Sequence, residues 1–418
     1  MPQSGSGTSC PHTEYAISER ISRRQLVQAL GATLALSVFS PGASLVQGAS
    51  SAPVGSSTPS GETSSQVGPA ASPTPGPTPP PTETETSAAA AQTTNVWAAT
   101  TGGLSAAVAD LPPRVYVPNE LGGDIAVIDP ASMQVVDRFW VGRTPHHVTP
   151  AHDLDRLYVN VMDSNRLVAI DPRSGRPVDS IPVAVPYNLY FTPDGTKAVV
   201  AAERFNRLDF YDPTTWQPIA RLPIPGSGVD HLDFSADGSF LLVSCEFGGQ
   251  VVKVDLDQLA VAGVLRVGGL PIDVKLAPDG TVFYVANQGR HGVSIVDPVA
   301  MQELAFLPTG RGAHGLALSR DTQVLFVSNR LAGTISVVDF AAWGVATSWL
   351  VGGSPDMLQV SPDGQQLWAS GRFFGVVNVI DTNTGRLLYR IPTGGGPHGL
   401  TYFPQPGRYS IGHNGVYR

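Results

Sequence analysis

The chain contains little cysteine and no excess of positive charge. Its 418 residues include only two cysteines, Cys10 and Cys245, so the part that follows residue 94 has a single thiol and can form no internal disulfide. Lysine and arginine together number 26 against 34 aspartates and glutamates, which leaves a formal net charge of −8. Proteins that bind nucleic acids need clustered positive charge to neutralise phosphates, so we expect no nucleic-acid partner.

Long hydrophobic runs and the local signatures of catalysis are also missing. The apolar run at residues 29–39 is too short to cross a membrane comfortably, so we expect no transmembrane span in the mature protein. No G-x-S-x-G, H-E-x-x-H or C-x-x-C-H motif and no dinucleotide fingerprint occurs. These absences favour a protein that is not an enzyme, although they leave its chemistry open.

The N-terminal region, residues 1–48, contains an arginine pair that lies between Ser22 and Leu26 and precedes the apolar run. It resembles a twin-arginine export signal; a general secretory signal or a chance arginine pair are the alternatives. We therefore expect an exported protein that is periplasmic, associated with the cell wall or secreted. The twin-arginine route carries folded proteins, often with a cofactor already loaded, and this favours a bound metal or cofactor.

Residues 49–94 consist mainly of Ser, Thr, Pro, Gly and Ala and contain almost no large apolar side chain. A segment of this composition cannot bury a core, so it is predicted to be a disordered linker. The proline-rich stretch at residues 73–81 favours an extended spacer with polyproline character. A lead-in segment at residues 95–113 joins the linker to the part of the chain that can fold.

The rest of the chain is a repeat of about 42 residues. Within one copy, four short segments rich in β-branched and aromatic residues are separated by Gly, Pro and Asp turns, so they predict four antiparallel strands. Such a sheet cannot bury both faces alone, and the copies must stack around an axis as blades of a β-propeller. The copies begin at Arg114, Arg156, Lys197, Phe240, Val282, Val324 and Gln366.

The two ends of the repeat predict how the ring closes. The first copy lacks an inner strand ahead of residue 114, whereas an unmatched inner strand occurs at residues 398–403. We therefore predict an all-β, seven-bladed propeller at residues 114–407, with four antiparallel strands per blade, in which the C-terminal strand joins the N-terminal blade. This closure would remove exposed sheet edges. Residues 408–418 are predicted to be a C-terminal tail.

Three recurring elements, Y-V-x-N, I-D-P and P-H-G-L-x-x-S-P-D-G, are found across residues 114–407. They resemble the YVTN-type β-propeller repeats of YncE-like proteins. The resemblance implies the propeller fold. It does not choose a function, because similar propellers include lactonases, metal-dependent oxidases, haem-handling proteins and surface binding proteins.

One aligned position at the start of each inner strand carries mostly polar residues, and these seven positions should surround the mouth of the central channel. Each imidazole could hydrogen-bond a loop carbonyl and hold its blade; alternatively, the four histidines could bind Zn, Cu or Fe, since neutral imidazoles are common ligands of these metals. Alternation with Asn, Asp and Met counts against a purely structural role. The seven residues, called here the column, are His147, Asn188, His231, Asp273, His314, Met357 and His398.

The loop between the second and third strands of each blade should reach the same mouth. Arginines there are suited to bidentate capture of a carboxylate or phosphate, or they could pair with Glu203, Glu246 and Asp356 on a solvated rim. With two column residues added, the candidate ligand-binding set is Asn188, Asp273, Glu203, Glu246, Arg204, Arg330 and Arg372.

Cys245 ends a second strand in the blade whose inner strand carries His231. A Cys/His pair could bind copper or act as a nucleophile and base. A lone cysteine in a strand is more often a small buried apolar residue, and we favour that interpretation.

These observations lead to one main functional hypothesis and two alternatives. The main hypothesis is an exported, monomeric binding or scaffolding propeller with a polar site at the channel mouth for a protein, a glycan or a small anionic ligand. The first alternative is a metal-dependent oxidase or lactonase-like hydrolase that uses the four histidines, with Glu203 or Glu246 as base. The second is a haem- or tetrapyrrole-handling protein with one of these histidines as axial ligand.

Overall fold

The computed structural model describes residues 95–413 and 416–418. The predicted export signal at residues 1–48 and the predicted linker at residues 49–94 lie outside the described residues and stay predictions. Within the described part of the chain, no helix is long and apolar enough to cross a membrane.

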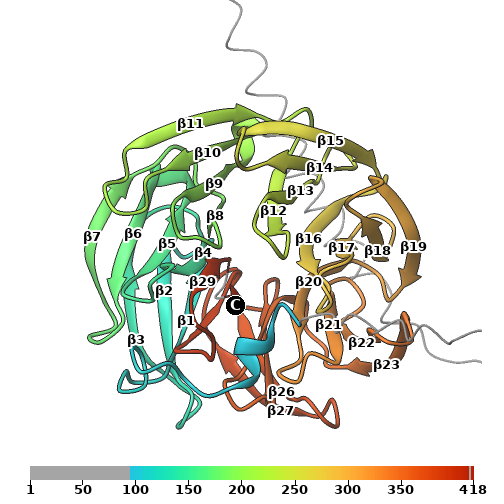
Figure 1. The fold of residues 1–418 in the computed structure, drawn as a ribbon. Helices are drawn as coiled ribbons and strands as arrows, with labels where there is room; N and C mark the ends of the chain where they lie inside the picture. The colour runs from blue at the N-terminus through green and yellow to red at the C-terminus, as the bar shows by residue number, and fades with distance from the viewer. Residues whose placement is uncertain (1–94, 414–415) are drawn as a thin grey trace, which may run out of the picture. The chain divides into compact units, whose positions relative to one another are not determined.

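Seven antiparallel sheets surround a common axis, and each contains the four strands of one blade (Figure 1). This confirms the predicted all-β, seven-bladed propeller. From the innermost to the outermost strand, blade 1 contains β28 (Thr401–Phe403), β1 (Arg114–Asn119), β2 (Asp124–Asp129) and β3 (Gln134–Trp140), and blade 2 contains β4 (Pro145–Pro150), β5 (Leu157–Val161), β6 (Arg166–Asp171) and β7 (Arg176–Pro182). Blade 3 contains β8 (Asn188–Phe191), β9 (Ala198–Ala202), β10 (Arg207–Tyr211) and β11 (Pro218–Pro223). Blade 4 contains β12 (Val229–Phe234), β13 (Phe240–Cys245), β14 (Gln250–Asp255) and β15 (Ala260–Arg266).

Blades 5 to 7 have the same strand order. Blade 5 contains β16 (Pro271–Leu276), β17 (Phe283–Asn287), β18 (Gly292–Asp297) and β19 (Gln302–Pro308). Blade 6 contains β20 (Ala313–Leu318), β21 (Val324–Asn329), β22 (Thr334–Asp339) and β23 (Gly344–Leu350). Blade 7 contains β24 (Pro355–Val360), β25 (Gln366–Gly371), β26 (Val376–Asp381) and β27 (Leu387–Pro392). Three short 3-10 helices, η1 (Ala98–Thr101), η2 (Met162–Ser164) and η3 (Glu203–Phe205), complete this part of the fold.

The ring closes as predicted. The C-terminal strand β28 pairs antiparallel with β1, with Tyr116 opposite Thr401, Val115 opposite Tyr402 and Arg114 opposite Phe403. Blade 1 therefore has three strands from the N-terminal end of the ring and one from the C-terminal end. This pairing leaves no inner edge of β1 exposed.

The core lies between neighbouring sheets. The second and third strands of each blade are mostly buried, whereas the outermost strands consist mainly of exposed and half-buried residues. Large side chains such as Phe210, Phe234 and Phe283 pack in one cluster that spans several blades. Burial of each such side chain contributes about 1.5–3 kcal/mol, and because each interface needs both sheets, the blades stabilise one another.

Side chains of the inner strands also bind the next blade directly. In each case a side-chain oxygen accepts a hydrogen bond from a backbone amide one blade further along the chain, which satisfies a polar group in the buried centre of the ring. The pairs are Tyr190 with Leu232 N, Asp233 with Leu276 N, Asp273 with Leu316 N and Gln359 with Tyr402 N.

The C-terminus lies inside the ring, at its centre in Figure 1. Residues 408–418, predicted from the sequence to be a tail, contain two further strands, β29 (Ser410–Gly412) and β30 (Val416–Tyr417). Strand β29 pairs with the inner strand β8 of blade 3, and β30 pairs with β29. The described part of this segment, residues 408–413 and 416–418, is called the C-terminal hairpin below.

The lead-in segment covers one end of the same space. Trp97 is buried, and its indole nitrogen donates a hydrogen bond to the carbonyl oxygen of Leu276, the last residue of β16. The guanidinium carbon of Arg418 lies 4.8 Å from the centroid of the Trp97 ring. The lead-in segment and the hairpin therefore pack together at the end of the channel where the inner strands finish.

Candidate functional site

Five of the seven column residues lie where the inner strands are irregular. All seven are buried. A β-bulge interrupts a ladder and re-aims side chains, which explains how these residues face the axis from a strand. The ladder between first and second strands shifts register at Pro145/Val148, Val229/Leu232, Pro271/Val274, Ala313/Leu316 and Pro355/Leu358.

Serines of the second strands satisfy amides that these bulges release. Ser244 Oγ accepts a hydrogen bond from the backbone amide of His231 at 3.1 Å, and Ser370 Oγ accepts one from Met357 at 3.1 Å. The bulged backbone is therefore stabilised by partners on the neighbouring strand. These hydrogen bonds to the backbone fix the positions of the column residues that carry the amides.

Buried histidines gather around the axis of the propeller. The ring centroids of His147 lie 4.7 Å from His398 and 5.1 Å from His231, and those of His231 and His413 lie 4.5 Å apart. Six of the nine histidines of the chain belong to this histidine cluster: His146, His147, His231, His314, His398 and His413.

Two members of the cluster were not among the predicted site residues. His146 precedes a column position, and the His146-His147 pair was the only signal that could have indicated it. His413 lies in the C-terminal hairpin, outside the repeat, so no aligned position points to it. Its place became apparent only because the hairpin enters the ring.

Three sets of side chains are close enough to hold a metal ion. Within each set, the potential ligand atoms lie within 4.8 Å of one another, and all members are buried. A tetrahedral ion with metal–nitrogen bonds near 2.1 Å needs ligands about 3.4 Å apart, so some of these atoms would have to move closer around an ion. The sets are His146, His147 and His398; His147, His231 and His413; and His314, Asp356 and His398.

The four histidines predicted as metal ligands therefore do not form one set. His147 and His231 share a set with His413, whereas His314 and His398 share one with Asp356. The structure brings all four into the cluster, where His147 and His398 also share the remaining set with His146.

Burial keeps the imidazoles neutral. It lowers the pKa of His314 to about 4, with a contribution from the charge of Arg330. Burial also lowers the pKa of His413, and it holds the pKa values of His231 and His398 well below the usual range. Neutral rings at pH 7 keep a lone pair available, which metal coordination requires.

Asn188 and Asp273, predicted to bind a ligand, hold the rings of the cluster. Asn188 Nδ2 lies 3.0 Å from Nδ1 of His231 and 2.9 Å from Nδ1 of His413. Asp273 Oδ1 lies 3.4 Å from Nε2 of His413, while its Oδ2 accepts the amide hydrogen bond of Leu316 at 2.8 Å. Asp273 therefore combines a structural contact between blades with a negative charge beside the cluster.

The predicted arginines Arg330 and Arg372 are engaged in a buried ion network. Arg330 Nε donates to Asp356 Oδ1 at 2.7 Å, and Arg330 also contacts His314. Arg372 pairs with Glu120 and lies 3.5 Å from Asp356 Oδ2. Burial acts to raise the pKa of Asp356, but Arg330 and its other partners hold it well below its usual range. Both guanidinium groups are thus neutralised by carboxylates of the protein.

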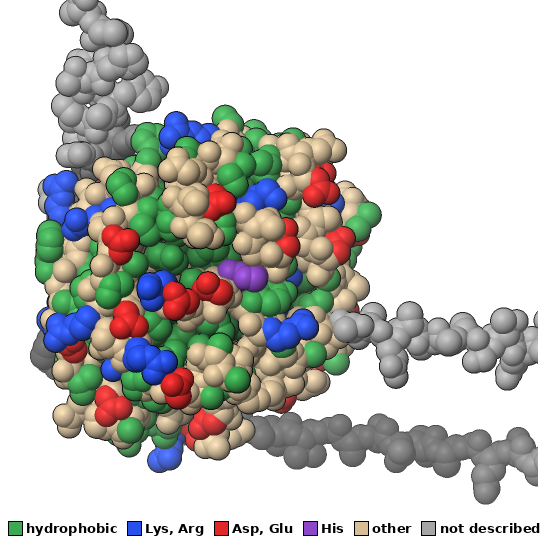
Figure 2. Space-filling model, turned by 60° about the vertical axis from the view of Figure 1, so that its left-hand side comes forward, with side chains coloured by type: hydrophobic (Ala, Val, Ile, Leu, Met, Phe, Trp, Pro, Cys, Tyr) green, Lys and Arg blue, Asp and Glu red, His purple; other side chains and the backbone are tan. Residues whose placement is uncertain are grey.

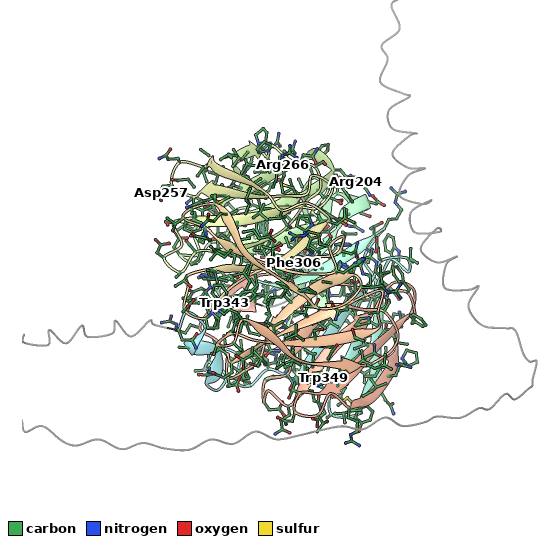
Figure 3. The ribbon with its side chains drawn as sticks, turned by 90° about the vertical axis from the view of Figure 1, so that its right-hand side faces the viewer. Arg204, Asp257, Arg266, Phe306, Trp343 and Trp349 are labelled. Atoms are coloured by element: carbon green, nitrogen blue, oxygen red, sulfur yellow. The ribbon has the colours of Figure 1, made fainter. Side chains whose placement is uncertain are left out.

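The remaining predicted ligand residues lie apart from this network. Glu203 is buried and Glu246 is half-buried, and with Asp230 they add negative charge near Tyr187, whose pKa is raised well above its usual value, first by burial and then by these charges. Arg204 lies at the surface (Figure 3), where its Nη1 is 2.5 Å from Asp163 Oδ1. The seven predicted residues therefore do not converge on one open pocket.

The face of the molecule in Figure 2 carries Lys and Arg side chains interspersed with Asp and Glu. No extended patch of one sign covers it. The expectation that the protein has no nucleic-acid partner stays a prediction.

Cys245 is part of the hydrophobic core rather than of a reactive site. Its side chain is fully buried in the cluster that contains Leu241, Val243 and Val251. Burial raises the pKa of the thiol to about 12, so almost no thiolate forms at neutral pH.

We expect the Cys245 thiol to resist modification in the folded protein. In a variant with Cys10→Ser, so that one thiol remains, a thiol-reactive chromogenic disulfide should react at least about 100-fold faster after denaturation than before it. The absorbance of the released thiolate measures both rates. Rapid reaction in the native state, with unchanged circular dichroism, would show that the thiol is accessible and would contradict the core assignment.

Comparison with known proteins agrees with the fold. The family model described as "YNCE-like beta-propeller" matches residues 87–406. No protein among the curated sequences matches the chain.

Similar solved structures share the fold at low identity. Kuenenia stuttgartiensis hydrazine synthase is 20% identical over 68% of this chain and 99% of that chain, with a TM-score of 0.58. A putative 6-phosphogluconolactonase from Bacteroides uniformis is 16% identical over 69% of this chain and 99% of that chain, with a TM-score of 0.58. The dihydro-heme d1 dehydrogenase NirN is 17% identical over 70% of this chain and 75% of that chain, with a TM-score of 0.55. At these identities the likeness extends to the fold alone. The match of the family model over most of the chain shows that the protein belongs to the YNCE-like β-propeller family.

Proposed function

We propose that this protein is an exported metal-binding propeller that holds a transition-metal ion in its histidine cluster. One observation carries the proposal: six histidines meet on the axis, and each is at most 3% exposed. Imidazoles suit Zn, Cu and Fe. Export is part of the proposal on the strength of the arginine pair and the apolar run near the N-terminus.

The charge of the site supports a cation more than an anion. Arg330 and Arg372, which would capture a small anionic ligand, are already paired with Asp356 and Glu120. An anion would have to displace these buried carboxylates, which costs several kcal/mol for each broken pair. A cation that binds the neutral imidazoles beside Asp273 would not have to displace a paired carboxylate.

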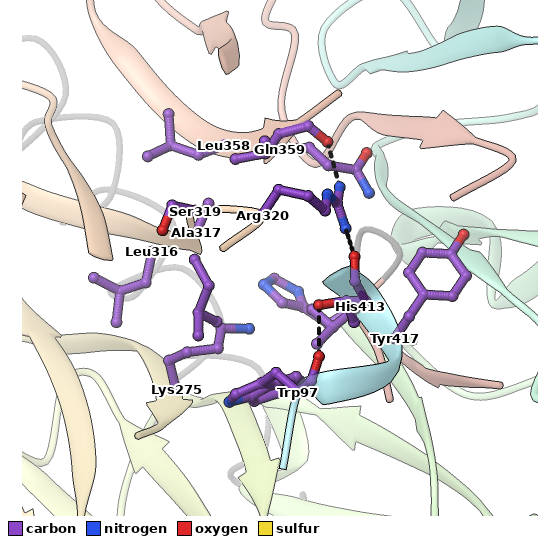
Figure 4. Close-up of a pocket in the computed structure, with 14 residues that line it drawn as sticks. Trp97, Lys275, Leu316, Ala317, Ser319, Arg320, Leu358, Gln359, His413 and Tyr417 are labelled. Atoms are coloured by element: carbon purple, nitrogen blue, oxygen red, sulfur yellow. Dashed lines mark hydrogen bonds between the residues drawn. The ribbon is translucent and has the colours of Figure 1, made fainter. Parts of the chain in front are cut away.

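Retention of an ion fits the site better than turnover of a substrate. A catalytic metal site keeps a position open to the substrate, whereas the imidazoles here are enclosed. The cavity that His413 lines is too small for a tetrapyrrole, because its volume is about 70 Å³ (Figure 4). That volume accommodates a few water molecules.

Metal titration tests the proposal. We expect the purified protein to bind Zn²⁺ or Co²⁺, with Co²⁺ producing the visible absorption of a nitrogen-ligated ion. The variant His147→Ala should weaken binding by more than about 100-fold, because loss of a ligand costs more than loss of an outer-shell partner. His147 is chosen because it belongs to two of the three sets.

The control for this titration is His291→Ala, which removes an exposed histidine outside the cluster. It should bind the ion as the unaltered protein does. If the folded protein took up no Zn²⁺ or Co²⁺, or if His147→Ala bound as tightly as the control, the proposed function would be wrong.

A further inference from the structure

The C-terminal hairpin enters the channel from the end at which the inner strands finish. Its base is held by Arg418, whose guanidinium donates hydrogen bonds to the carbonyl oxygens of Ser235 and Phe234 at 2.9 and 2.6 Å and to Asp233 Oδ1 at 3.0 Å. Arg418 is 3% exposed. The hairpin is therefore anchored to blade 4 at one end and reaches the histidine cluster at the other.

A glycine allows the hairpin to lie directly against blade 3. A Cβ atom at Gly412 would be 2.5 Å from both the Leu189 carbonyl oxygen and the Tyr190 Cα, and the residue has a φ of +103°. Only glycine fits both the close approach and this backbone conformation. The next residue, His413, is thereby placed beside the inner strand β8, and its amide donates to Leu189 O at 3.0 Å.

His413 completes one of the three candidate metal sets. Its ring centroid lies 4.5 Å from that of His231 and 5.2 Å from that of His147. Figure 4 shows His413 among the residues that line a small cavity, which include Lys275, Arg320 and Tyr417. Without the hairpin, the set would lose one of its three ligands.

Neighbouring charges single out this set from the other two. Asp356 of the set with His314 is paired with Arg330 and Arg372, whose positive charges oppose a bound cation. His398, which belongs to that set and to the set with His146, lies 3.5 Å from the same Asp356; burial lowers the pKa of its ring, and the positive charge of Arg372 lowers it further.

The set with His413 has carboxylates behind its rings instead. Asp230 Oδ1 lies 3.7 Å from Nε2 of His231, and Asp273 Oδ1 lies 3.4 Å from Nε2 of His413. Metal-bound imidazoles commonly donate their second N–H to a carboxylate. Lys275, two residues beyond Asp273 on β16, offsets part of this negative charge but leaves two carboxylates against one ammonium.

The Nδ1 atoms of the same two rings converge on one amide. Asn188 Nδ2 lies within 3.0 Å of Nδ1 of His231, Nδ1 of His413 and the hydroxyl of Tyr190. An amide nitrogen has two hydrogens for these three acceptors. The third contact therefore needs another donor, and the Tyr190 hydroxyl, 3.4 Å from Nδ1 of His231, can supply it. Rotation of Asn188 would leave both Nδ1 atoms facing a common point.

We infer that His413, His147 and His231 bind one metal ion and that this ion holds the C-terminal hairpin in the channel. The hairpin held in this way is called the plug below. The inference rests on the proposed metal-binding function. The three rings are at most 3% exposed, so the ion leaves only when the plug or the mouth opens. By linkage, an ion bound to the docked hairpin alone stabilises that docked state.

Hydrogen exchange and chelator competition on the full chain test this coupling. Zn²⁺ should slow amide exchange in peptides spanning residues 408–418 by about tenfold or more. In His413→Gln, which keeps a polar side chain at this position, Zn²⁺ should not slow this exchange, and an excess of chelator should remove the ion at least about tenfold faster. The control His291→Ala should behave as the unaltered chain.

A second variant loosens the plug without removing a ligand. Arg418→Ala removes the anchor at the base of the hairpin, so the ion should again leave at least about tenfold faster although all three imidazoles are present. Thermal unfolding without metal establishes that each variant is folded before its release rate is measured.

The outcomes separate the two proposals. Suppose that Zn²⁺ binding depends on His147, but that Zn²⁺ leaves amide exchange at residues 408–418 unchanged and is released no faster from His413→Gln or Arg418→Ala. The inference about the plug is then wrong, and the proposed metal-binding function stands. If the unaltered chain binds no Zn²⁺, both are overturned.

Discussion

A chain that ends at Pro397 is expected not to fold. Such a chain lacks strand β28, so β1 becomes an exposed inner edge and the ring loses its closure. The buried side chains of Leu400, Tyr402 and Phe403 are lost from two core clusters. At about 1.5–3 kcal/mol each, their loss alone is comparable to the 5–15 kcal/mol that separates folded from unfolded domains.

Near-ultraviolet circular dichroism and size-exclusion chromatography measure the result. The control is a chain that begins at Ser87, which keeps the whole compact unit Ser87–Arg418 and should unfold at the temperature of the full chain. A milder variant, Phe403→Ala, should fold but lose about 3–5 kcal/mol of unfolding free energy. Cooperative unfolding of the chain that ends at Pro397, at the temperature of the control, would show that closure is not required.

Acid is expected to destabilise the metal-free protein between pH 6.5 and about pH 4. The pKa of His314 falls from 6.5 to about 4 in the folded protein because of burial and Arg330, and the pKa values of His231, His398 and His413 are also lowered, first by burial. The unfolded chain therefore takes up protons that the folded chain rejects. Stability is complete above pH 6.5 and is lost as the pH falls below it.

The expected size of the loss follows from the number of groups. Each lowered histidine contributes a slope of about 1.4 kcal/mol per pH unit, so four together give about 5 kcal/mol per unit where all of them titrate. Asp273 and Asp356 have lowered pKa values despite burial, which acts to raise them; their stabilisation is lost only below pH 3.8 and does not enter this range.

Urea unfolding at several pH values, in the presence of a chelator, measures this slope. In the variant His314→Gln, the slope of unfolding free energy against pH should be smaller by the contribution of one histidine, about 1.4 kcal/mol per pH unit. Zn²⁺ should increase stability at pH 7 and steepen the loss on acidification, because protons compete with the ion for the rings. An unfolding free energy that stays constant from pH 7 to pH 5 would contradict the burial of neutral imidazoles.

Much of the architecture could be read from the repeat. Short strands with β-branched side chains, separated by Asp-Gly and Asp-Pro turns, determine local geometry, and a nearly constant spacing of the copies converts that geometry into a ring. The unmatched strand at residues 398–403 predicted the closure that β28 and β1 form. Because equivalent positions of a ring share one environment, the column placed His147, His231, His314 and His398 around the axis as well.

The partners of these histidines could not be predicted in the same way. The sequence predicts that Arg330 and Arg372 bind a ligand. In the structure, the carboxylates of Asp356 and Glu120 neutralise their charges. These pairs join residues on different blades, and their contacts depend on side-chain distances of a few ångströms that a repeat period does not specify.

The sequence alone therefore establishes the number of blades, the closure and the axial position of four histidines, because each depends on a short pattern that recurs at a regular interval. Tertiary structure alone decides that His413 joins them and that the histidines form three overlapping sets. Residues 408–418 carry no repeat, so nothing local directs them into the ring. Their position depends on the anchor at Arg418 and the close approach at Gly412, which exist only after the blades have come together.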